Sequence, residues 1–392
     1  MDALTTPLNW QRVRLGDILE LLTDYHANGS YELLKNNVTL LKHVDFAIMI
    51  RTTNFENNDF KNDLIYINKK AYEFLSKSKV FAGDILVNKI ANAGTAYFMP
   101  KLNQPVSLGM NLFLLRIKPN YNNFFIFKQI ANYERVLKTF ANGSATKTIT
   151  KNVIKNLLIP LPPLNEQIAI ANILSDVDHY LYSLDALILK KESIKKALSF
   201  ELLSQRKRLK GFNQAWQRVR LGDICEIVKG QQINKISLNN TDKYPVINGG
   251  IDFLGYTNKF NVSKNTIAIS EGGTCGYVRF MTSDFWSGGH NYSLQKISNK
   301  VNNLCLYHIL KSYEKDIMKL GVGTGLKNIQ LKALKDFEIF LPPLNEQIAI
   351  ANILSDLYSE IISLKNKKRQ FENIKKALNH DLMSAKIRVL KE

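Results

Sequence analysis

The chain repeats itself in separate blocks. The segment WQRVRLGDI occurs at residues 10–18 and again at 216–224, and LPPLNEQIAIANILSD occurs at 161–176 and again at 341–356. The first pair is offset by 206 residues (216 − 10) and the second by 180 (341 − 161), so the first copy holds 26 more residues (206 − 180). A duplication decides architecture before any other signal. We therefore expect two similar halves, each a globular segment followed by the same long helix.

Weaker matches fill in the frame between the blocks. On this alignment the 26-residue excess lies before Gly94, within the stretch 24–79. Segments that stay identical are expected to do the same job twice, and segments that diverge on a shared frame to do similar jobs on different targets. A recent duplication that has not drifted would instead leave the similarity spread evenly. The matches are Gly94-Thr95 with Gly273-Thr274, and Gly143, Lys147 and Ile149 with Gly323, Lys327 and Ile329.

A helical period begins after each Pro-Pro pair. In the first copy apolar residues step by three and four from Leu174 to Ile188, and the second copy repeats the steps from Leu354. This stripe predicts a coiled-coil seam. Each helix is about 40 residues long, so ~60 Å, and needs a partner to cover the stripe. We expect antiparallel pairing of the two helices within the chain, and the alternative is a parallel coiled coil between two chains.

The segments 11–160 and 217–340 contain short apolar runs broken by turn signals such as Asn28-Gly29 and Asn248-Gly249-Gly250. This pattern predicts strands with some helix. The predicted fold class is therefore mixed α+β, with two globular domains with β-rich cores joined by two long helices. The expected order is a first globular domain (1–160), a long helix (161–210), a second globular domain (211–340) and a second long helix (341–392).

The charge balance points to a polyanionic partner. The chain carries 53 Lys and Arg against 34 Asp and Glu, a net charge of +19. Double-stranded DNA is the first candidate, and the alternative is a proteome whose proteins are all Lys-rich.

The cysteines and the hydropathy of the chain limit the cellular compartments in which we expect the protein. Cys225, Cys275 and Cys305 form no C-x-x-C pair, which argues against a disulfide framework or a thiolate zinc site and fits a reducing cytoplasm. The first ten residues lack the apolar run of a secretory signal. No apolar stretch approaches the ~18 residues of a membrane span, so we expect no membrane partner.

The turns of both globular segments carry polar side chains of the kind that read base edges. Ordinary solvated loops have the same composition, so clusters in matching loops count for more than single residues. The predicted DNA-contacting residues are Asn88, Lys89, Asn92, Thr95, Lys147 and Thr148 in the first half, and Ser270, Thr274, Arg279, Lys327 and Asn328 in the second.

Signatures of nucleic-acid-modifying enzymes are missing. There is no [NDS]-P-P-[YF] tetrapeptide of amino-methyltransferases and no G-x-x-x-x-G-K-[ST] phosphate loop. The six histidines are scattered, which predicts no metal site. His290 stands where the first half has Met110, so a shared catalytic role is doubtful. We therefore predict no catalytic residue in this chain.

The doubled frame, with LPPLNEQ before each long helix and RLGDI near the start of each globular segment, resembles the specificity (S) subunits of type I restriction-modification systems. The resemblance covers essentially the whole chain. It implies that each globular segment is a target-recognition domain for one half of a split DNA sequence. It further implies that the helices form the spacer and the docking surface for two methyltransferase (M) subunits, and that restriction (R) subunits join the larger assembly.

The resemblance also implies that S-adenosylmethionine, ATP and Mg²⁺ are bound by partner subunits and not by this chain. Because the globular segments differ, we expect an asymmetric DNA target. Two other readings stay open: a coiled-coil scaffold that joins two protein-binding domains, and a standalone modification enzyme, which the missing motifs disfavour. The Trp10 strip is expected to pack close to the end of the second helix.

Overall fold

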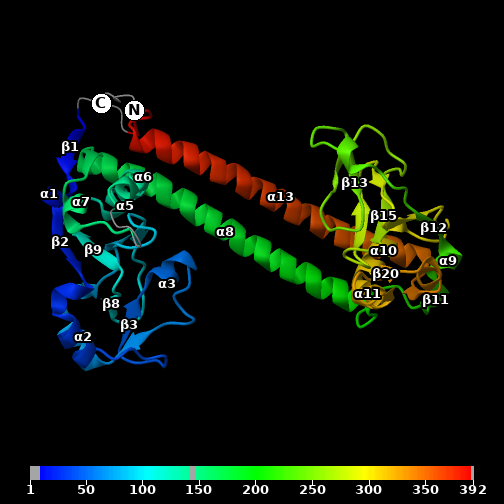
Figure 1. The fold of residues 1–392 in the computed structure, drawn as a ribbon, viewed down its shortest axis with the longest axis horizontal. Helices are drawn as coiled ribbons and strands as arrows, with labels where there is room; N and C mark the ends of the chain where they lie inside the picture. Colours follow the sequence, from blue (N-terminus) through cyan, green and yellow to red (C-terminus); the bar gives the residue numbers. More distant parts are fainter. Residues whose placement is uncertain (1–8, 142–146, 390–392) are drawn as a thin grey trace. The chain divides into compact units, whose positions relative to one another are not determined.

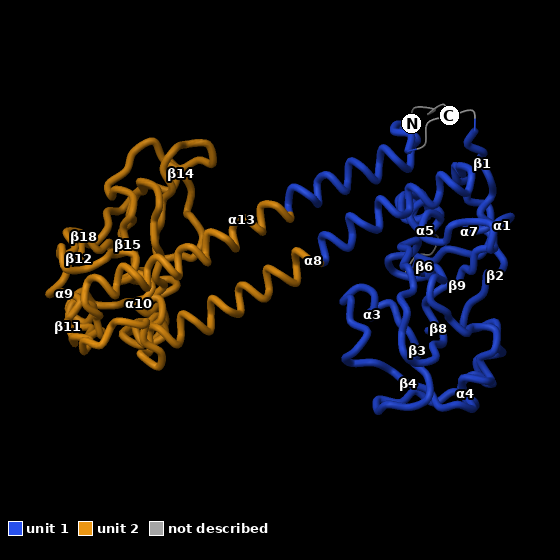
Figure 2. Tube along the Cα trace, turned by 180° about the vertical axis from the view of Figure 1, so that it is seen from behind, with its two compact units in different colours: residues 1–182, 369–392 blue, residues 183–368 orange. Residues whose placement is uncertain are grey.

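The computed structural model describes residues 9–141 and 147–389 (Figure 1). Contacts divide the chain into unit 1, residues 1–182 and 369–392, and unit 2, residues 183–368 (Figure 2). Each unit holds one globular segment, the first part of one long helix and the last part of the other. The linear boundaries at 160, 210 and 340 stay predictions, since the units cut across both helices. Of the predicted repeat anchors, Gly143 lies outside the described residues.

The globular part of unit 1 is built on two four-stranded sheets. The first is antiparallel throughout, and one face packs on helices α5 (Asn123–Asn132) and α6 (Glu134–Thr139) through a shared apolar core. The second sheet contains one parallel pair, β3 with β8. In spatial order the strands are β2 (Leu19–Asp24), β9 (Leu112–Ile117), β6 (Ile85–Asn88) and β7 (Ala96–Phe98), then β4 (Tyr66–Ile67), β3 (Ala47–Ile50), β8 (Val106–Leu108) and β5 (Lys79–Val80).

Unit 2 repeats this plan. Its four-stranded sheet packs on helices α10 (Asn303–Ser312) and α11 (Glu314–Lys319), and its second sheet again holds a parallel pair, β13 with β17. The mixed fold with β-rich cores is therefore confirmed. The strands in spatial order are β12 (Glu226–Lys229), β18 (Asn291–Gln295), β15 (Thr266–Ser270) and β16 (Val278–Met281), then β14 (Gly255–Thr257), β13 (Tyr244–Ile247) and β17 (Trp286–Ser287).

The excess residues of the first half fold largely as helix. Between β2 and β6, unit 1 contains α2 (Tyr31–Asn37), α3 (Thr52–Glu56) and α4 (Lys69–Phe74), and α2 and α4 pack with β3 and β4 around a satellite core. Between β12 and β15, all of which the structure describes, the one helical element of unit 2 is a short 3-10 turn, η3 (Lys235–Ser237). The insertion predicted within 24–79 is therefore real structure added to one domain.

The two long helices are α8 (Leu164–Leu203) and α13 (Leu344–Met383). In unit 1 the start of α8 lies against the end of α13, where Lys375 pairs with Asp178 at 2.5 Å. In unit 2 the end of α8 lies against the earlier part of α13, where Lys191 pairs with Glu360 at 2.8 Å. The antiparallel pairing within the chain is therefore confirmed.

A buried glutamate in the first turn of each long helix accepts hydrogen bonds from a tryptophan and an arginine, and we call these three residues the clamp. In unit 1 Glu166, 2% exposed at its side chain, accepts hydrogen bonds from Trp10 Nε1 at 3.3 Å and Arg388 Nε at 2.9 Å. Trp10 leads into β1 (Gln11–Arg14), and Arg388 follows the end of α13. The predicted packing of the Trp10 strip beside the end of the second helix is confirmed.

Unit 2 has the same clamp, and both of its donors come from one continuous segment, residues 208–216. Glu346 accepts from Trp216 Nε1 at 3.1 Å and from Arg208 at 2.7 and 2.8 Å. Arg208 precedes Arg388 by the repeat offset of 180 residues (388 − 208). The neighbouring Gln167 and Gln347 accept from the backbone amides that begin α5 and α10, at 3.0 and 2.7 Å. These contacts explain why the NEQ of both copies is unchanged.

Helix α5 meets the long helices through an ionic cluster. Lys128 donates to Asp178 at 2.9 Å, and Lys375 shares the same carboxylate. Burial raises the pKa of Asp178, but hydrogen bonds from Lys375 and Lys128 outweigh it, so the pKa lies below its ordinary value. The junction is therefore held by charge.

At the matching positions of unit 2, each 180 residues away, stand His308, Tyr358 and Lys195. Lys195 Nζ lies 4.4 Å from the Tyr358 ring centroid, so an aromatic face replaces the carboxylate. Burial, followed by the charge of Lys195, lowers the pKa of His308 to about 4. Among the described residues, His308 Nε2 has no hydrogen-bond partner. This junction therefore requires a neutral imidazole.

Within the described ranges, none of the helices combines the length and apolar character that a bilayer crossing needs.

Replacing Glu346 with Ala should destabilise unit 2 by about 3 kcal/mol, because it leaves Arg208 and the Trp216 N–H without their buried acceptor. The matched control is Glu360→Ala, which breaks an ion pair whose glutamate is 47% exposed and should cost less than about 1 kcal/mol. Hydrogen exchange read by mass spectrometry should locate the loss in unit 2 peptides. Equal effects of the two substitutions would contradict the clamp's role.

Unit 2 should lose stability in mild acid before unit 1. Below a pH of about 6.5 the unfolded state protonates His308 while the folded state, with a pKa of about 4, does not, so the free energy of unfolding falls by about 2 kcal/mol at pH 5. Asp178 has a lowered pKa, so its contribution is lost only below about pH 4. Urea unfolding at pH 7 and pH 5 should show the loss, and His308→Gln should remove most of it. An unchanged pH dependence in that variant would refute the assignment.

Candidate nucleic-acid interface

Loops of unit 2 meet beyond the end of β15. Thr274 N donates to Gly249 O at 2.8 Å, and Glu271 N donates to His290 O at 2.9 Å. The amide of Ile329, in the short strand β20 (Asn328–Ile329), donates to Glu271 O at 2.9 Å. Predicted residues from separate parts of the sequence are thereby brought into one cluster: Ser270, Thr274 and Asn328.

Glycine permits this approach of backbones. A Cβ at Gly249 would lie 2.5 Å from Gly272 O, and one at Gly273 would lie 2.8 Å from Gly249 O. Gly249 and Gly273 also have φ values of 83° and 69°, which side-chain-bearing residues rarely adopt. A Cβ at Gly272 would collide with the side-chain oxygen of Asn328. The glycines therefore set how closely the polar loops can gather.

Two further polar residues of this cluster, Asn248 and His290, are not among the predicted DNA-contacting residues. Asn248 Oδ1 accepts from His290 N at 2.9 Å, and the His290 ring is 57% exposed. His290 Nδ1 lies 3.9 Å from a carboxylate oxygen of Glu271. The Asn-Gly-Gly and Gly-Gly-His turns are the signals that could have found them.

Matching hydrogen bonds define which residues of the two halves correspond. In unit 1 the Gly94 amide donates to Asn88 O at 2.9 Å, and in unit 2 the Gly276 amide donates to Ser270 O at 2.8 Å. The predicted alignment of Gly94 with Gly273 is therefore wrong, because Gly273 has a separate task against Gly249. The offset here is 182 (276 − 94), so 24 of the excess residues (206 − 182) lie before this turn and 2 (182 − 180) after it.

Three predicted residues of unit 1 have partners inside the fold. Asn88 is buried, accepts from Thr52 Oγ1 at 3.0 Å and donates to the Tyr97 hydroxyl at 3.1 Å. Lys89 pairs with an aspartate, and Thr95 Oγ1 donates to Glu134 at 2.9 Å. Their side chains position the loop, and their contact with DNA stays a prediction.

The remaining predicted residues are more accessible. Asn92 is exposed and donates weakly to Glu56 at 3.4 Å. Lys147 is exposed, and Thr148 is half-buried through a β-bridge to Ile90. In unit 2 the exposed residues are Lys327 and Asn328, the half-buried ones are Thr274 and Arg279, and Ser270 is buried.

An ion pair directly after β6 in unit 1 has a counterpart directly after β15 in unit 2, and the two partners have exchanged their charges. In unit 1 Lys89 pairs with Asp24 of β2 at 3.0 Å. In unit 2 the equivalent position is Glu271 (271 − 89 = 182), which pairs with Lys229 of β12 at 2.7 Å. The scaffold is therefore the same, but the charge that each loop carries is opposite.

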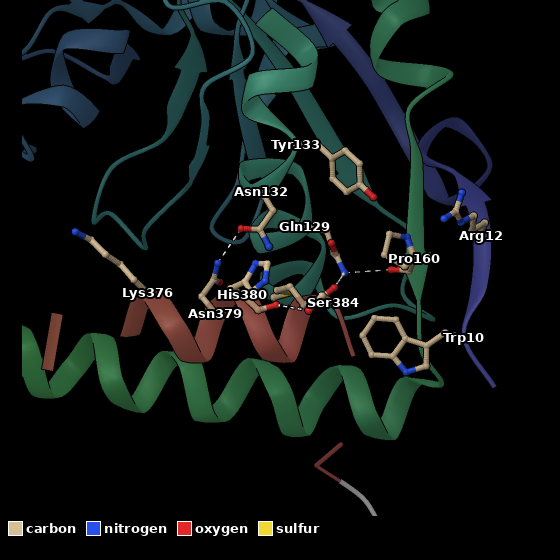
Figure 3. Close-up of a pocket in the computed structure, with 11 residues that line it drawn as sticks. Trp10, Arg12, Gln129, Asn132, Tyr133, Pro160, Lys376, Asn379, His380 and Ser384 are labelled. Carbon is tan, nitrogen blue, oxygen red and sulfur yellow. Dashed lines mark hydrogen bonds between the residues drawn. The ribbon is translucent and has the colours of Figure 1, made fainter. Parts of the chain in front are cut away.

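A cavity of about 450 Å³ lies beside the clamp of unit 1, between β10 (Leu158–Leu161), α5 and the last turns of α13 (Figure 3). Asn379 Nδ2 donates to Asn132 Oδ1 at 2.8 Å, and Gln129 Nε2 donates to Pro160 O at 3.2 Å. None of the predicted DNA-contacting residues lines this cavity. It belongs to the junction of domain and helix and not to the loop cluster.

Potential metal ligands do not gather among the described residues, where no group of three or more His, Cys, Asp and Glu is placed to hold an ion. Cys225 and Cys305 are buried, and burial raises the pKa of each thiol to about 12.

Comparison with known proteins identifies the family. A model of the type I restriction modification DNA specificity domain matches residues 7–195 and 213–373. The putative type I restriction enzyme MjaX specificity subunit of Methanocaldococcus jannaschii is 30% identical over 417 residues, covering 97% of each chain. The MjaVIII specificity subunit of the same organism is 26% identical, covering 99% of this chain and 95% of the other.

The fold has also been seen before. The crystal structure of a type I restriction-modification S subunit from M. genitalium matches with a TM-score of 0.66 at 21% identity, over 96% of both chains. With two matches to the family model over most of its length, this chain belongs to the family of type I restriction-modification specificity subunits.

Proposed function

We propose that each globular segment reads one half of an asymmetric, bipartite DNA target, and that the helix pair sets the gap between the halves. The observation that carries this is the shared loop scaffold with diverged side chains. The backbone contacts around Asn88 recur around Ser270, whereas Lys89 is replaced by Glu271. A conserved frame with exchanged, even charge-reversed, side chains suits two readers of different sequences.

Unchanged parts of the repeat suit a partner that binds twice. Leu164 and Ile168 of α8 are 41% and 42% exposed, and their copies Leu344 and Ile348 of α13 are 37% and 40% exposed. Large apolar side chains one helical turn apart on an outer face favour a protein contact. Because each unit presents the same pair, two copies of one methyltransferase subunit can dock.

In this proposal the chain itself is not catalytic. Adenine methylation with S-adenosylmethionine, and restriction with ATP and Mg²⁺, belong to the methyltransferase and restriction subunits that it recruits. Its own contribution is base recognition and the positioning of those partners on double-stranded DNA.

The proposal predicts a methylated motif with two unlike half-sites and a constant gap. Methylome sequencing of cells that carry this chain with its methyltransferase partner tests it, with cells lacking this chain as control. Filter binding of the complex at rising salt should show a steep fall in affinity, because phosphate contacts release counterions. A missing or palindromic motif would contradict the proposal, and negligible DNA binding at low salt would favour the scaffold alternative.

Substituting Ile168 with Glu should remove one of two methyltransferase copies, and Ile168→Glu with Ile348→Glu should remove both. These side chains are about two-fifths exposed, so the fold should tolerate the change. Tyr182→Glu is the matched control, since Tyr182 is 70% exposed on the same helix but is replaced by Ile362 in the repeat. Native mass spectrometry of the purified complex counts the copies. Two bound copies in the double variant would rule out this surface.

A further inference from the structure

Arg279 is held in an unusual setting in unit 2. It lies on β16, the edge strand of the four-stranded sheet. Its guanidinium carbon is 5.0 Å from the ring centroid of Phe253 and 5.4 Å from that of Tyr277. Two aromatic rings therefore hold the guanidinium without using its N–H donors.

No carboxylate neutralises this arginine among the described residues. Two half-buried arginines elsewhere in the chain are paired by contrast: Arg116 with Asp84 at 2.8 Å, and Arg208 with Glu346 at 2.7 Å. Arg279 has its two rings and is half-buried. A guanidinium carries five N–H donors, so a stacked but unpaired fork is ready to bind an acceptor from outside the chain.

The rings that hold Arg279 belong to the glycine-lined loop cluster. Tyr277 O accepts from Ser270 N at 3.0 Å, at the end of β15. Phe253 follows the Gly249-Gly250 turn, which contacts the loop 271–277. Arg279 is therefore anchored to the same loops as Asn248 and His290.

Unit 1 fills the same position with a neutral, satisfied side chain. Tyr97 pairs with Leu86 of β6, as Arg279 pairs with Ala268 of β15. Tyr97 stacks on Phe55 with centroids 4.8 Å apart. Its hydroxyl accepts from Asn88, and burial, followed by the charge of Glu56, raises its pKa. An aromatic ring thus lies beside this position in both halves, and unit 2 places a cation there.

We infer that Arg279 reads a guanine in the half-site of unit 2, donating two hydrogen bonds from its fork to O6 and N7 in the major groove. This rests on the proposed function and names a base and a reader within it. A planar, preoriented arginine fork matches the paired acceptors of guanine, which no other base presents. Tyr97, at the equivalent position of unit 1, has no guanidinium fork, so we expect it to impose no requirement for guanine on its half-site.

The test uses the full chain with its methyltransferase subunits in cells, and reads the methylated motif from Arg279→Gln and Arg279→Lys variants. Both should lose the requirement for G at one position of one half-site, with the other half-site and the gap unchanged. Lysine keeps the charge but not the fork, so it should lose less affinity than glutamine does and still relax the requirement. Lys315→Ala is the control, because Lys315 is an exposed cation of α11 in the same unit and is not among the predicted DNA-contacting residues.

Filter binding separates a base contact from a phosphate contact. Loss of a base contact should weaken cognate DNA about 10- to 100-fold and leave non-cognate DNA nearly unchanged, whereas loss of a phosphate contact weakens both alike. Uniform weakening in Arg279→Gln, or an unaltered motif in both variants, would overturn the inference. If the unsubstituted chain yields no bipartite motif, the proposed function itself fails, and the two failures are distinguishable. Melting by circular dichroism checks folding, and a folded Arg279→Lys variant suffices for the test.

Discussion

Each unit closes around one buried carboxylate. Burying Glu166 or Glu346 is tolerable only because donors surround it, and those donors come from the strip before the first strand and from the segment after the other long helix. One side chain thereby ties the start of one helix, the end of the other and the root of a domain. The loops of the globular segments can diverge because the frame that carries them is fixed elsewhere.

Because the chain is duplicated, residues that the fold requires can be distinguished from residues that differ between the two halves. The glutamate and the arginine of the clamp recur at the 180-residue offset, and the tryptophan recurs at the 206-residue offset, each with the same partners, so the fold demands them. The reversed pair at Lys89 and Glu271 keeps attraction while exchanging sign, which preserves the loop but alters its field. Lys128 forms an ion pair at the junction with the long helices, whereas its counterpart His308 is neutral. Both residues pack at this junction, but the charge there is not retained.

The sequence predicted the features that follow from repeats and periodic patterns, such as the helix pairing. It did not predict features that depend on contacts between particular side chains. The helix pairing followed from the stripe that includes Leu174 and Ile188, since burial of that stripe requires a partner. The alignment at Gly94 failed because two Gly-Thr dipeptides look alike but make different contacts. Asn88 looked like a free polar side chain, yet at the end of a central strand it is buried and satisfied. No period or composition reports such pairings.

The clamp has a genetic consequence. In unit 2 its arginine and tryptophan lie eight residues apart (216 − 208), but in unit 1 they come from far-separated parts of the chain, Trp10 and Arg388. A nonsense codon just after Ala385 would spare every residue of the first globular segment and still remove the cation that partners Glu166. The globular segment encoded first would then be the one that suffers from a lesion encoded last, while the globular segment nearer the lesion in sequence would keep its clamp whole.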